Sequence, residues 1–479
     1  MTSFWYYTIS MDENTIFQNP QTAQIPQEQI PQPSPVSSEN YSPDAGGSLL
    51  GTIIKIIIGL AVIGIIIFLI FSFVLPLFKK GSNGKAQLTY WGLWEDSNII
   101  QPIIEDFRKQ YPNITVSYAK QDIKQYRQKL STRMKNNTGP DIFAFHNTWL
   151  PMISDILLPL PDATITKNEF KNSYYPVAEK DLIKNGAIYG IPMEIDTLAL
   201  YVNTEIFKAA GISPPNNWED FIKVARSLTV IDENGKIKTS GAALGAFDNI
   251  THAPDVASLL LIQNGADIKN LTSTSKKASD ALTFYTSFVI GDQKVWDSTL
   301  DPSILAFSKG NLAMYFGYSW DYFTIKAMNP DITFEIYPVP HLTGVNTTIA
   351  SYWVQGVSAK SKYQKETLLF LKFLAKAETA EKLFTLSAKT RVFGEPYARK
   401  DLASKLKDNL IVYPFVSQAS DAQSSFFASD TYDEGLNSQM NTYLGNAIRS
   451  IISNNNTSPE TAVLTLAQGV SQVLKQYGQ

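Results

Sequence analysis

Four segments between residues 87 and 145 decide the fold class: QLTYWGL (87–93), NIIQPIIEDFRKQY (98–111), ITVSYA (114–119) and DIFAF (141–145). Three of them are short and rich in β-branched and aromatic residues, which is typical of strands. The segment 98–111 instead has apolar residues at helical spacing and ends before a proline. Strands that alternate with amphipathic helices form a largely parallel sheet covered by helices. The sequence therefore predicts an α/β protein.

The overall composition is that of an ordinary folded protein, with 44% hydrophobic residues and a formal net charge of −3. No basic stripe is visible, and this excludes a typical nucleic-acid-binding surface. The absence of cysteine excludes disulfides and thiolate metal sites. The region after residue 85 is too long for a single core, so we expect two lobes.

One segment near the N-terminus is apolar on every face. Residues 56–78, IIIGLAVIGIIIFLIFSFVLPLF, contain no charge and are followed by Lys79 and Lys80. A bilayer core of about 30 Å is crossed by roughly 20 apolar residues, so this segment predicts a transmembrane helix, placed at 48–78. The preceding residues 1–47 are rich in Pro, Gln and Ser and are expected to be disordered. Either Met1 or Met11 is a possible start.

Polar and aromatic side chains follow the predicted strands, where loops of such a sheet present side chains to ligands. Trp91, Trp94 and Glu95 come at or after the first strand. After the strand 141–145 come His146, Asn147 and Trp149.

Six motifs in order along residues 86–479 resemble the extracellular solute-binding proteins of ABC importers, in the class that includes maltose-binding proteins. They are YWGLWED, TGPDIFAFHNTWLPMI, YGIPMEIDTLALYVNTEIFKAAGISPPNNWEDF, FSKGNLAMYFGYSWDY, SYWVQGVSAKSK and TSPETAVLTLAQGVSQVLK. The resemblance implies a two-lobed, periplasmic-binding-protein-like clamshell of α/β lobes that closes around a small solute. It implies no catalytic residue, metal or other cofactor.

The resemblance also implies where the chain passes between the lobes: near 198–203, near 329–333 and near 376. The expected domains are the tail 1–47, the transmembrane helix 48–78, a linker 79–85, lobe 1 (86–199 and 333–376) and lobe 2 (200–332 and 377–479).

Ligand-binding residues are carried over position by position. Asp196 matches an acidic position that accepts hydrogen bonds from sugar hydroxyls, although it fits a hinge cap as well. Trp320 matches a stacking tryptophan of the second lobe. The full set of expected ligand-binding residues is Trp94, Glu95, Phe145, Asn147, Asp196, Trp320, Trp353, Tyr432 and Asp433. Maltose-binding protein has an Asp-Arg pair where this chain has Asn147 and Trp149, so we do not expect the same oligosaccharide.

Catalytic motifs are absent from the sequence. The histidines 146, 252 and 341 have no HExxH spacing, and there is no G-x-S-x-G elbow or phosphate-binding G-x-x-x-x-G-K. His146 is expected to form hydrogen bonds in its loop instead of binding a metal.

The sequence thus predicts a non-enzymatic, membrane-anchored solute-binding protein that captures a carbohydrate for an ABC transporter permease. A polyamine ligand, a surface glycan-active enzyme and a sensory partner are the alternatives. Lys79, Lys80 and Lys85 would place the large domain in the cytoplasm by the positive-inside rule, but large domains translocate largely regardless of it. We therefore expect a single-pass protein of the cell membrane with its binding domain on the extracytoplasmic side.

Overall fold

The structure is a computed structural model that describes residues 85–291, 294–453 and 457–479. The expected tail and transmembrane helix lie outside the described residues, as does the linker apart from Lys85. Among the helices in the described part of the chain, none is long and apolar enough to cross a membrane. The described residues, which begin at Lys85, belong to one compact unit.

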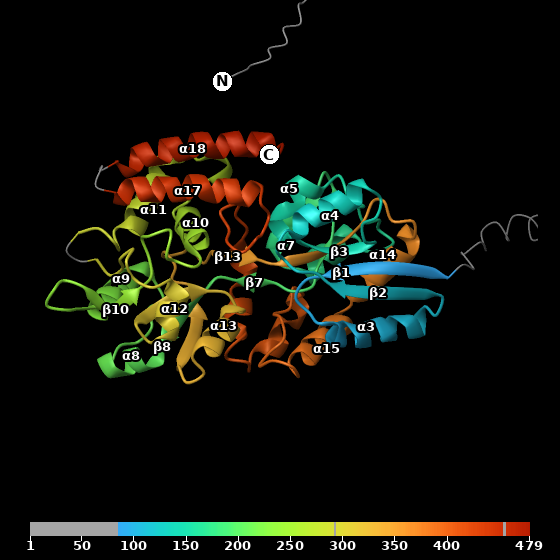
Figure 1. Cartoon of the computed structure of the whole chain (residues 1–479), viewed down its shortest axis with the longest axis horizontal. Coiled ribbons are helices and arrows are strands. Elements are labelled where there is room, and N and C mark those ends of the chain that lie inside the picture. Colours follow the sequence, from blue (N-terminus) through green and yellow to red (C-terminus); the bar gives the residue numbers. More distant parts are fainter. Residues whose placement is uncertain (1–84, 292–293, 454–456) are drawn as a thin grey trace, which may run out of the picture. The chain divides into compact units, whose positions relative to one another are not determined.

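Lobe 1 is built on a five-stranded sheet with the strand order β2-β1-β3-β14-β6 (Figure 1). Its first three strands are parallel, as expected, and β14 runs antiparallel to β3 and β6. The strands are β1 (Ala86–Gly92), β2 (Ile114–Lys120), β3 (Ile142–His146), β6 (Ile191–Pro192) and β14 (Trp353–Val357).

Helices cover both faces of this sheet. Alternate residues of β1 are buried and pack against α3 and α14, whose apolar residues recur at helical spacing. The helices of lobe 1 are α3 (Ser97–Gln110), α4 (Tyr126–Lys135), α5 (Leu150–Ile153), α6 (Lys167–Ser173), α7 (Pro176–Leu182), α14 (Gln364–Leu374) and α15 (Ala377–Ser387). Short elements are η2 (Asn147–Trp149), β4 (Ile183–Lys184), β5 (Ala187–Ile188) and η4 (Lys400–Leu406).

Lobe 2 contains a second five-stranded sheet, with the order β12-β8-β11-β10-β9. Its strands are β8 (Ala199–Asn203), β9 (Val230–Ile231), β10 (Ile237–Ala242), β11 (Leu312–Gly317) and β12 (Phe334–Pro338). Its helices are α8 (Thr204–Ala210), α9 (Trp218–Ser227), α10 (Ala253–Gln263), η3 (Ile268–Asn270), α11 (Ser275–Thr286), α12 (Ser303–Ser308), α13 (Asp321–Met328), α17 (Leu436–Ile452) and α18 (Pro459–Gln476).

Local capping explains the start of lobe 2. The side chain of Asn203 ends β8 and accepts hydrogen bonds from the backbone N–H groups of Glu205 and Ile206, so α8 begins there. Gly211 ends this helix in the left-handed conformation, with a φ of 67°, which glycine adopts without strain. Asn217 caps α9 in the same way as Asn203 caps α8.

A three-stranded sheet joins the lobes. Its strands are β7 (Asp196–Thr197), β13 (Thr348–Ser351) and β15 (Ala422–Gln423), in the order β15-β13-β7. In Figure 1, β7 and β13 lie between the two lobes. Strand β7 leads from β6 into β8, and β13 leads from β12 into β14, so these strands form the hinge. Between η4 and β15, the short elements α16 (Tyr413–Ser417) and η5 (Ala419–Asp421) pack beside it.

Two expected lobe boundaries are wrong. The return to lobe 1 was expected near 333, but β12 pairs with β8 along its whole length, and backbone pairing keeps the chain in lobe 2 until β13. A third crossing was expected near 376, but α15 packs against α3, and the residues between Phe393 and Ala422 fill the core of lobe 1. The chain passes into lobe 2 for the last time only after β15.

Candidate functional site

Two tryptophans form an aromatic surface on lobe 1. Trp94 follows β1 and Trp353 begins β14, and their ring centroids lie 5.4 Å apart in an edge-to-face arrangement. Trp94 is 39% exposed, whereas Trp353 is only 7% exposed because the rings of His146 and Trp149 support it from behind. The structure therefore brings together two of the predicted ligand-binding residues.

Next to this surface lies a group of carboxylates. The guanidinium of Arg391 forms ion pairs with Glu95 at 2.7 Å and with Glu395 at 3.0 Å. Glu194 lies beside them, and burial together with the charges of Glu395 and Glu95 raises the pKa of Glu194 well above its usual value. Burial likewise raises the pKa of Glu395, against the opposing charge of Arg391.

Lobe 2 presents its own aromatic surface at the end of β11. The rings of Tyr318 and Trp320 are stacked, with centroids 4.5 Å apart and an interplanar angle of 17°. Tyr318 is fully buried and Trp320 is half-buried. Between these two residues, Ser319 donates hydrogen bonds from its backbone N–H and its hydroxyl to the carboxylate of Asp196.

The position of Asp196 is that of a hinge cap, the second of the two roles that the sequence suggested for this residue. It is buried, and its carboxylate joins β7 to the loop after β11, where it also accepts a hydrogen bond from the backbone N–H of Thr197. Burial raises the pKa of Asp196 well above its usual value, and the charge of Glu395 adds to this effect. The acidic residues of lobe 1 and the Trp320 loop of lobe 2 thus lie on the same side of the hinge.

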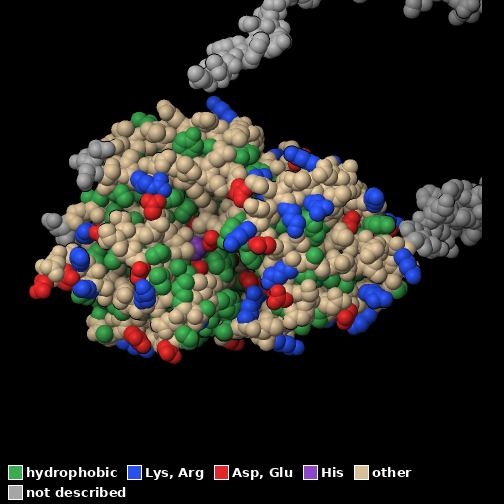
Figure 2. Space-filling view, in the orientation of Figure 1, with side chains coloured by type: hydrophobic (Ala, Val, Ile, Leu, Met, Phe, Trp, Pro, Cys, Tyr) green, Lys and Arg blue, Asp and Glu red, His purple; other side chains and the backbone are tan. Residues whose placement is uncertain are grey.

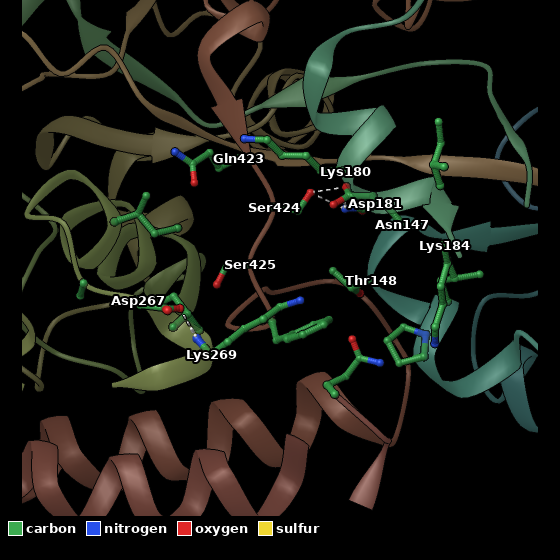
Figure 3. A pocket seen from close by; sticks show the side chains of 18 residues that line it. Asn147, Thr148, Lys180, Asp181, Lys184, Asp267, Lys269, Gln423, Ser424 and Ser425 are labelled. Atoms are coloured by element: carbon green, nitrogen blue, oxygen red, sulfur yellow. Dashed lines mark hydrogen bonds between the residues drawn. The ribbon is translucent and has the colours of Figure 1, made fainter. Parts of the chain in front are cut away.

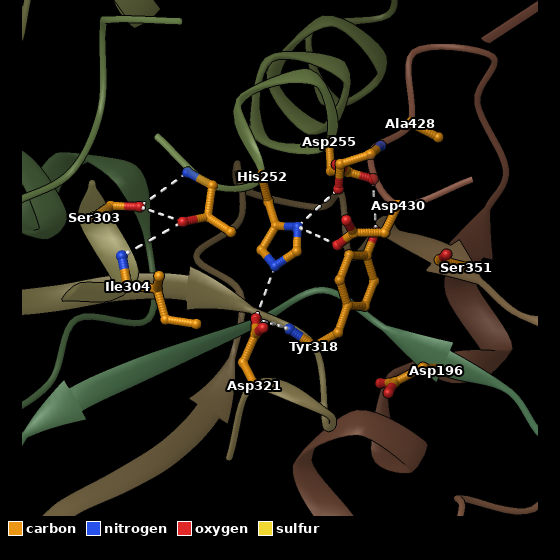
Figure 4. Close-up of polar contacts among 12 residues, drawn as sticks. Asp196, His252, Asp255, Ser303, Ile304, Tyr318, Asp321, Ser351, Ala428 and Asp430 are labelled. Atoms are coloured by element: carbon orange, nitrogen blue, oxygen red, sulfur yellow. Dashed lines mark hydrogen bonds and ion pairs between the residues drawn. The ribbon is translucent and has the colours of Figure 1, made fainter. Parts of the chain in front are cut away.

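A histidine lies at the centre of a polar cluster in lobe 2 (Figure 4). The Nε2 atom of His252 lies 2.7 Å from a carboxylate oxygen of Asp321, and its Nδ1 atom lies 2.7 Å from the hydroxyl of Ser429. Burial opposes a charge on this imidazole. The carboxylates of Asp321, Asp430 and Asp255 outweigh that effect and raise the pKa of His252 to about 9.

Ser429, His252 and Asp321 contact one another in the order of a hydrolase triad. The protonation state of His252, however, does not fit that of a general base. A general base must be neutral to take a proton from a serine hydroxyl. With a pKa of about 9, the imidazole of His252 is protonated at neutral pH. The contacts of His252 with Asp321 and Asp430 make this cluster a buried ion-pair network.

The segment 429–435 carries strained backbone at the point where the lobes meet. Asp430, Tyr432 and Glu434 have φ angles of 53°, 47° and 44°, in the left-handed region that non-glycine residues rarely occupy. The indole N–H of Trp149 in lobe 1 donates to the backbone oxygen of Thr431 at 3.0 Å. Such strain clusters at ligand-binding segments. The side chains of Asp430 and Tyr432 are both partly exposed there.

Two predicted site residues are wrong because the structure buries them. Phe145 lies inside β3, a strand with both faces covered, and belongs to the core of lobe 1. Asp433 is fully buried at the start of α17, where its carboxylate accepts hydrogen bonds from the backbone N–H groups of Asn437 and Ser438. Its role is to cap a helix.

Asn147 faces a different cavity (Figure 3). Its neighbour in space, Tyr352, precedes Trp353, and successive residues of an extended chain point to opposite sides. The amide of Asn147 donates to Asp181 at 3.0 Å and to Ser424 at 2.8 Å. This cavity has a volume of about 560 Å³, and neither Trp94 nor Trp353 is among its lining residues. Its side chains are mixed in charge and include Lys180, Asp181, Lys184, Asp267 and Lys269.

His146 forms hydrogen bonds, as predicted, but only one partner lies in its own loop; the other is on β13. Its ring nitrogens contact the hydroxyls of Thr148 at 2.8 Å and Ser351 at 3.0 Å, and burial lowers the pKa of His146 to about 3. In the described ranges, no group of three or more His, Asp or Glu side chains has a geometry that could hold a metal ion.

Sequence reasoning missed several residues of this site: Glu194, His252, Tyr318, Gln355, Arg391, Glu395 and Asp430. Glu194 and Tyr318 lie within quoted motifs, two residues from Asp196 and Trp320, so the motifs themselves contained that signal. No local pattern distinguishes Arg391 or Glu395, because they reach the site only through the packing of the segment after α15.

Two lobes on a strand hinge, with aromatic rings and carboxylates where they meet, define a clamshell solute-binding protein (Figure 2 shows charged side chains along the hollow between the lobes). The sequence model of the bacterial extracellular solute-binding protein family matches residues 91–381, and the chain belongs to this family.

Relatives and solved structures agree with this membership. A multiple sugar-binding protein of Streptococcus mutans is 22% identical over 350 residues, covering 67% of this chain and 77% of that protein. An arabinooligosaccharide-binding protein of Bacillus subtilis is 24% identical over 34% of this chain and 40% of its own length. The crystal structure of a cyclo/maltodextrin-binding protein complexed with maltotetraose has a TM-score of 0.68 at 19% identity, covering 82% of this chain and 99% of that one. These proteins are binding proteins and not enzymes.

Proposed function

We propose that this protein is a membrane-anchored, extracytoplasmic binding protein that captures a carbohydrate and delivers it to an ABC importer. One observation carries the ligand class: both lobes present aromatic surfaces on one side of the hinge, and carboxylates lie beside the aromatic surface of lobe 1. Aromatic rings stack on the apolar faces of sugar rings, and carboxylates accept hydrogen bonds from sugar hydroxyls. The sugar-binding relative from Streptococcus mutans supports this proposal.

The proposed ligand-binding residues follow from their position at this junction, where Trp94 and Tyr432 are exposed and Trp353 packs edge-to-face against Trp94. Trp94, Trp320, Trp353 and Tyr432 supply rings, and Glu95 supplies a carboxylate. The cavity around Asn147 fits a sugar less well, since its only aromatic ring is that of Phe426, and Lys269 covers that ring at 5.5 Å.

Closure around the ligand gives the first test. Bringing the lobes together removes cleft surface from solvent, so the liganded protein is more compact than the free protein. Small-angle X-ray scattering should show a smaller radius of gyration when a binding saccharide is added at saturation. An unchanged radius would argue against a clamshell mechanism even if the sugar binds.

The proposed membrane anchor, residues 48–78, rests on the uncharged apolar run 56–78, and the proposal places residues 1–47 on the cytoplasmic side. A single cysteine introduced by Ser82→Cys would be the only thiol of the protein, because the sequence has no cysteine. In intact cells it should react with a membrane-impermeant maleimide. Labelling only after lysis would place the domain in the cytoplasm and exclude delivery to an importer.

A further inference from the structure

A small hollow enters lobe 1 beside the two tryptophans. Its volume is about 40 Å³, which is room for a water molecule or an amino group. Three carboxylate residues line it: Glu95, Glu194 and Glu395. The wall is otherwise aromatic and apolar apart from Gln355 and Thr379, and it includes Tyr90, Trp94, Tyr118 and Trp353.

An unsatisfied acceptor also lines this hollow. Gln355 stands two residues after Trp353 in β14, so both side chains project from the same face of the sheet. Gln355 is only 7% exposed, and its side-chain oxygen is buried without a hydrogen-bond partner in the described part of the protein. Buried polar atoms are almost always paired, so this oxygen is available to a donor that enters the hollow.

The three carboxyl groups of the hollow outnumber the ion-pair partners that the described residues offer them. Arg391 forms ion pairs with Glu95 and Glu395. The third carboxyl group, that of Glu194, has no ion pair or hydrogen bond within the described ranges. A sugar hydroxyl can donate a hydrogen bond to Glu194 but carries no charge to stabilise its ionised form. A protonated amine does both, and the surrounding aromatic faces attract it further.

We propose that this hollow binds a protonated amino group, so that the captured solute is an amine-bearing saccharide. This inference rests on the proposed carbohydrate-binding function and specifies its substrate class. The amine donates to the oxygen of Gln355 and to the carboxylate of Glu194, while the sugar rings to which it is attached cover Trp94.

The proposal predicts how affinity depends on pH. Burial, then the charges of Glu395 and Glu95, raise the pKa of Glu194, Asp196 adds to the effect and Arg391 opposes it. Ammonium binding favours the ionised carboxylate, so the affinity for an amine rises as pH rises through the raised pKa. A neutral sugar has no charge to gain from this ionisation, so its affinity changes less.

Calorimetric titration of the full-length protein in detergent tests the proposal with three probes: a β-1,4-linked glucosamine trisaccharide, the glucose trisaccharide of the same linkage, and spermidine. The glucosamine trisaccharide should bind at least roughly tenfold more tightly than the glucose trisaccharide, as a charged hydrogen bond provides. This ratio should fall as the pH is lowered and the carboxylates with raised pKa values become protonated.

Two variants test whether Glu194 causes the preference for the glucosamine trisaccharide. Glu194→Gln keeps the size of the side chain and should bring the ratio of the two affinities close to one. Glu233→Gln, an exposed residue of the turn between β9 and β10, is the matched control and should leave the ratio unchanged. The pH dependence of the unmutated protein remains decisive if Glu194→Gln does not fold.

The three probes separate this inference from the proposed function. Equal or tighter binding of the glucose trisaccharide overturns the amine site and leaves carbohydrate binding intact. Binding of spermidine alone supports the amine site and overturns the carbohydrate function. Binding of none of the three probes overturns the inference.

Discussion

Replacing Trp320 by alanine is expected to weaken saccharide binding by at least about 2 kcal/mol, which is roughly a 30-fold loss of affinity. One face of this ring stacks on the buried Tyr318, and the half-buried side chain leaves the other face available to a ligand. Stability should suffer less, because truncating a core tryptophan costs about 3–5 kcal/mol and Trp320 is not fully enclosed.

Two measurements on the Trp320→Ala variant distinguish a binding role from a core role. Calorimetry gives the ligand affinity, and denaturant unfolding without ligand gives the free energy of unfolding. Tyr363→Ala is the control, since this exposed ring of lobe 1 lies at the start of α14. A Trp320→Ala variant that loses several kcal/mol of stability but binds normally would return this residue to the core.

The second large effect is expected for His252→Gln, which should lower the free energy of unfolding by about 3–5 kcal/mol. The replacement removes the cation that pairs with the buried carboxylates around His252. The folded-state pKa of about 9 lies above the ordinary value of 6.5. The stabilisation from the charged imidazole is therefore fully present below pH 6.5 and is lost as pH rises through 9. The stability difference between the unmutated protein and the variant should narrow over this range.

Denaturant unfolding of His252→Gln at a series of pH values checks this prediction. His341→Gln serves as the control, because this ring contacts only a backbone oxygen, that of Leu342, at 3.3 Å among the described residues. A difference for His252→Gln that stays constant between pH 6.5 and 9 would show that the imidazole is neutral in the folded protein.

The sequence predicted the fold class well because the class depends on local periodicity. Alternate residues of β1 are buried as the pattern of QLTYWGL indicates, and Ile99, Ile103 and Phe107 form one face of α3. The lobe boundaries depend on partners that are distant in sequence. Whether 334–338 belongs to lobe 1 or lobe 2 is decided by pairing with β8, which no local pattern reveals.

The site residues divide in the same way. Trp94 follows β1 and Trp353 begins β14. Their position at the ends of strands, where loops present side chains to ligands, was therefore predictable. Phe145 also lies near the end of a strand, but its side chain points into the core of lobe 1. The residue type alone does not reveal the direction in which a side chain points. Glu395 reaches the site through the long connection after α15, which sequence periodicity does not describe.

Calorimetric titration of the purified protein with a panel of mono- and oligosaccharides tests the central claim most directly. We predict that at least one saccharide binds, and that at 100 times its dissociation constant it raises the free energy of unfolding by about 2.7 kcal/mol. The bound sugar should be recovered without chemical change. The absence of binding by every saccharide, with stabilisation by a non-carbohydrate solute, would contradict the assignment of this protein as a carbohydrate-binding protein.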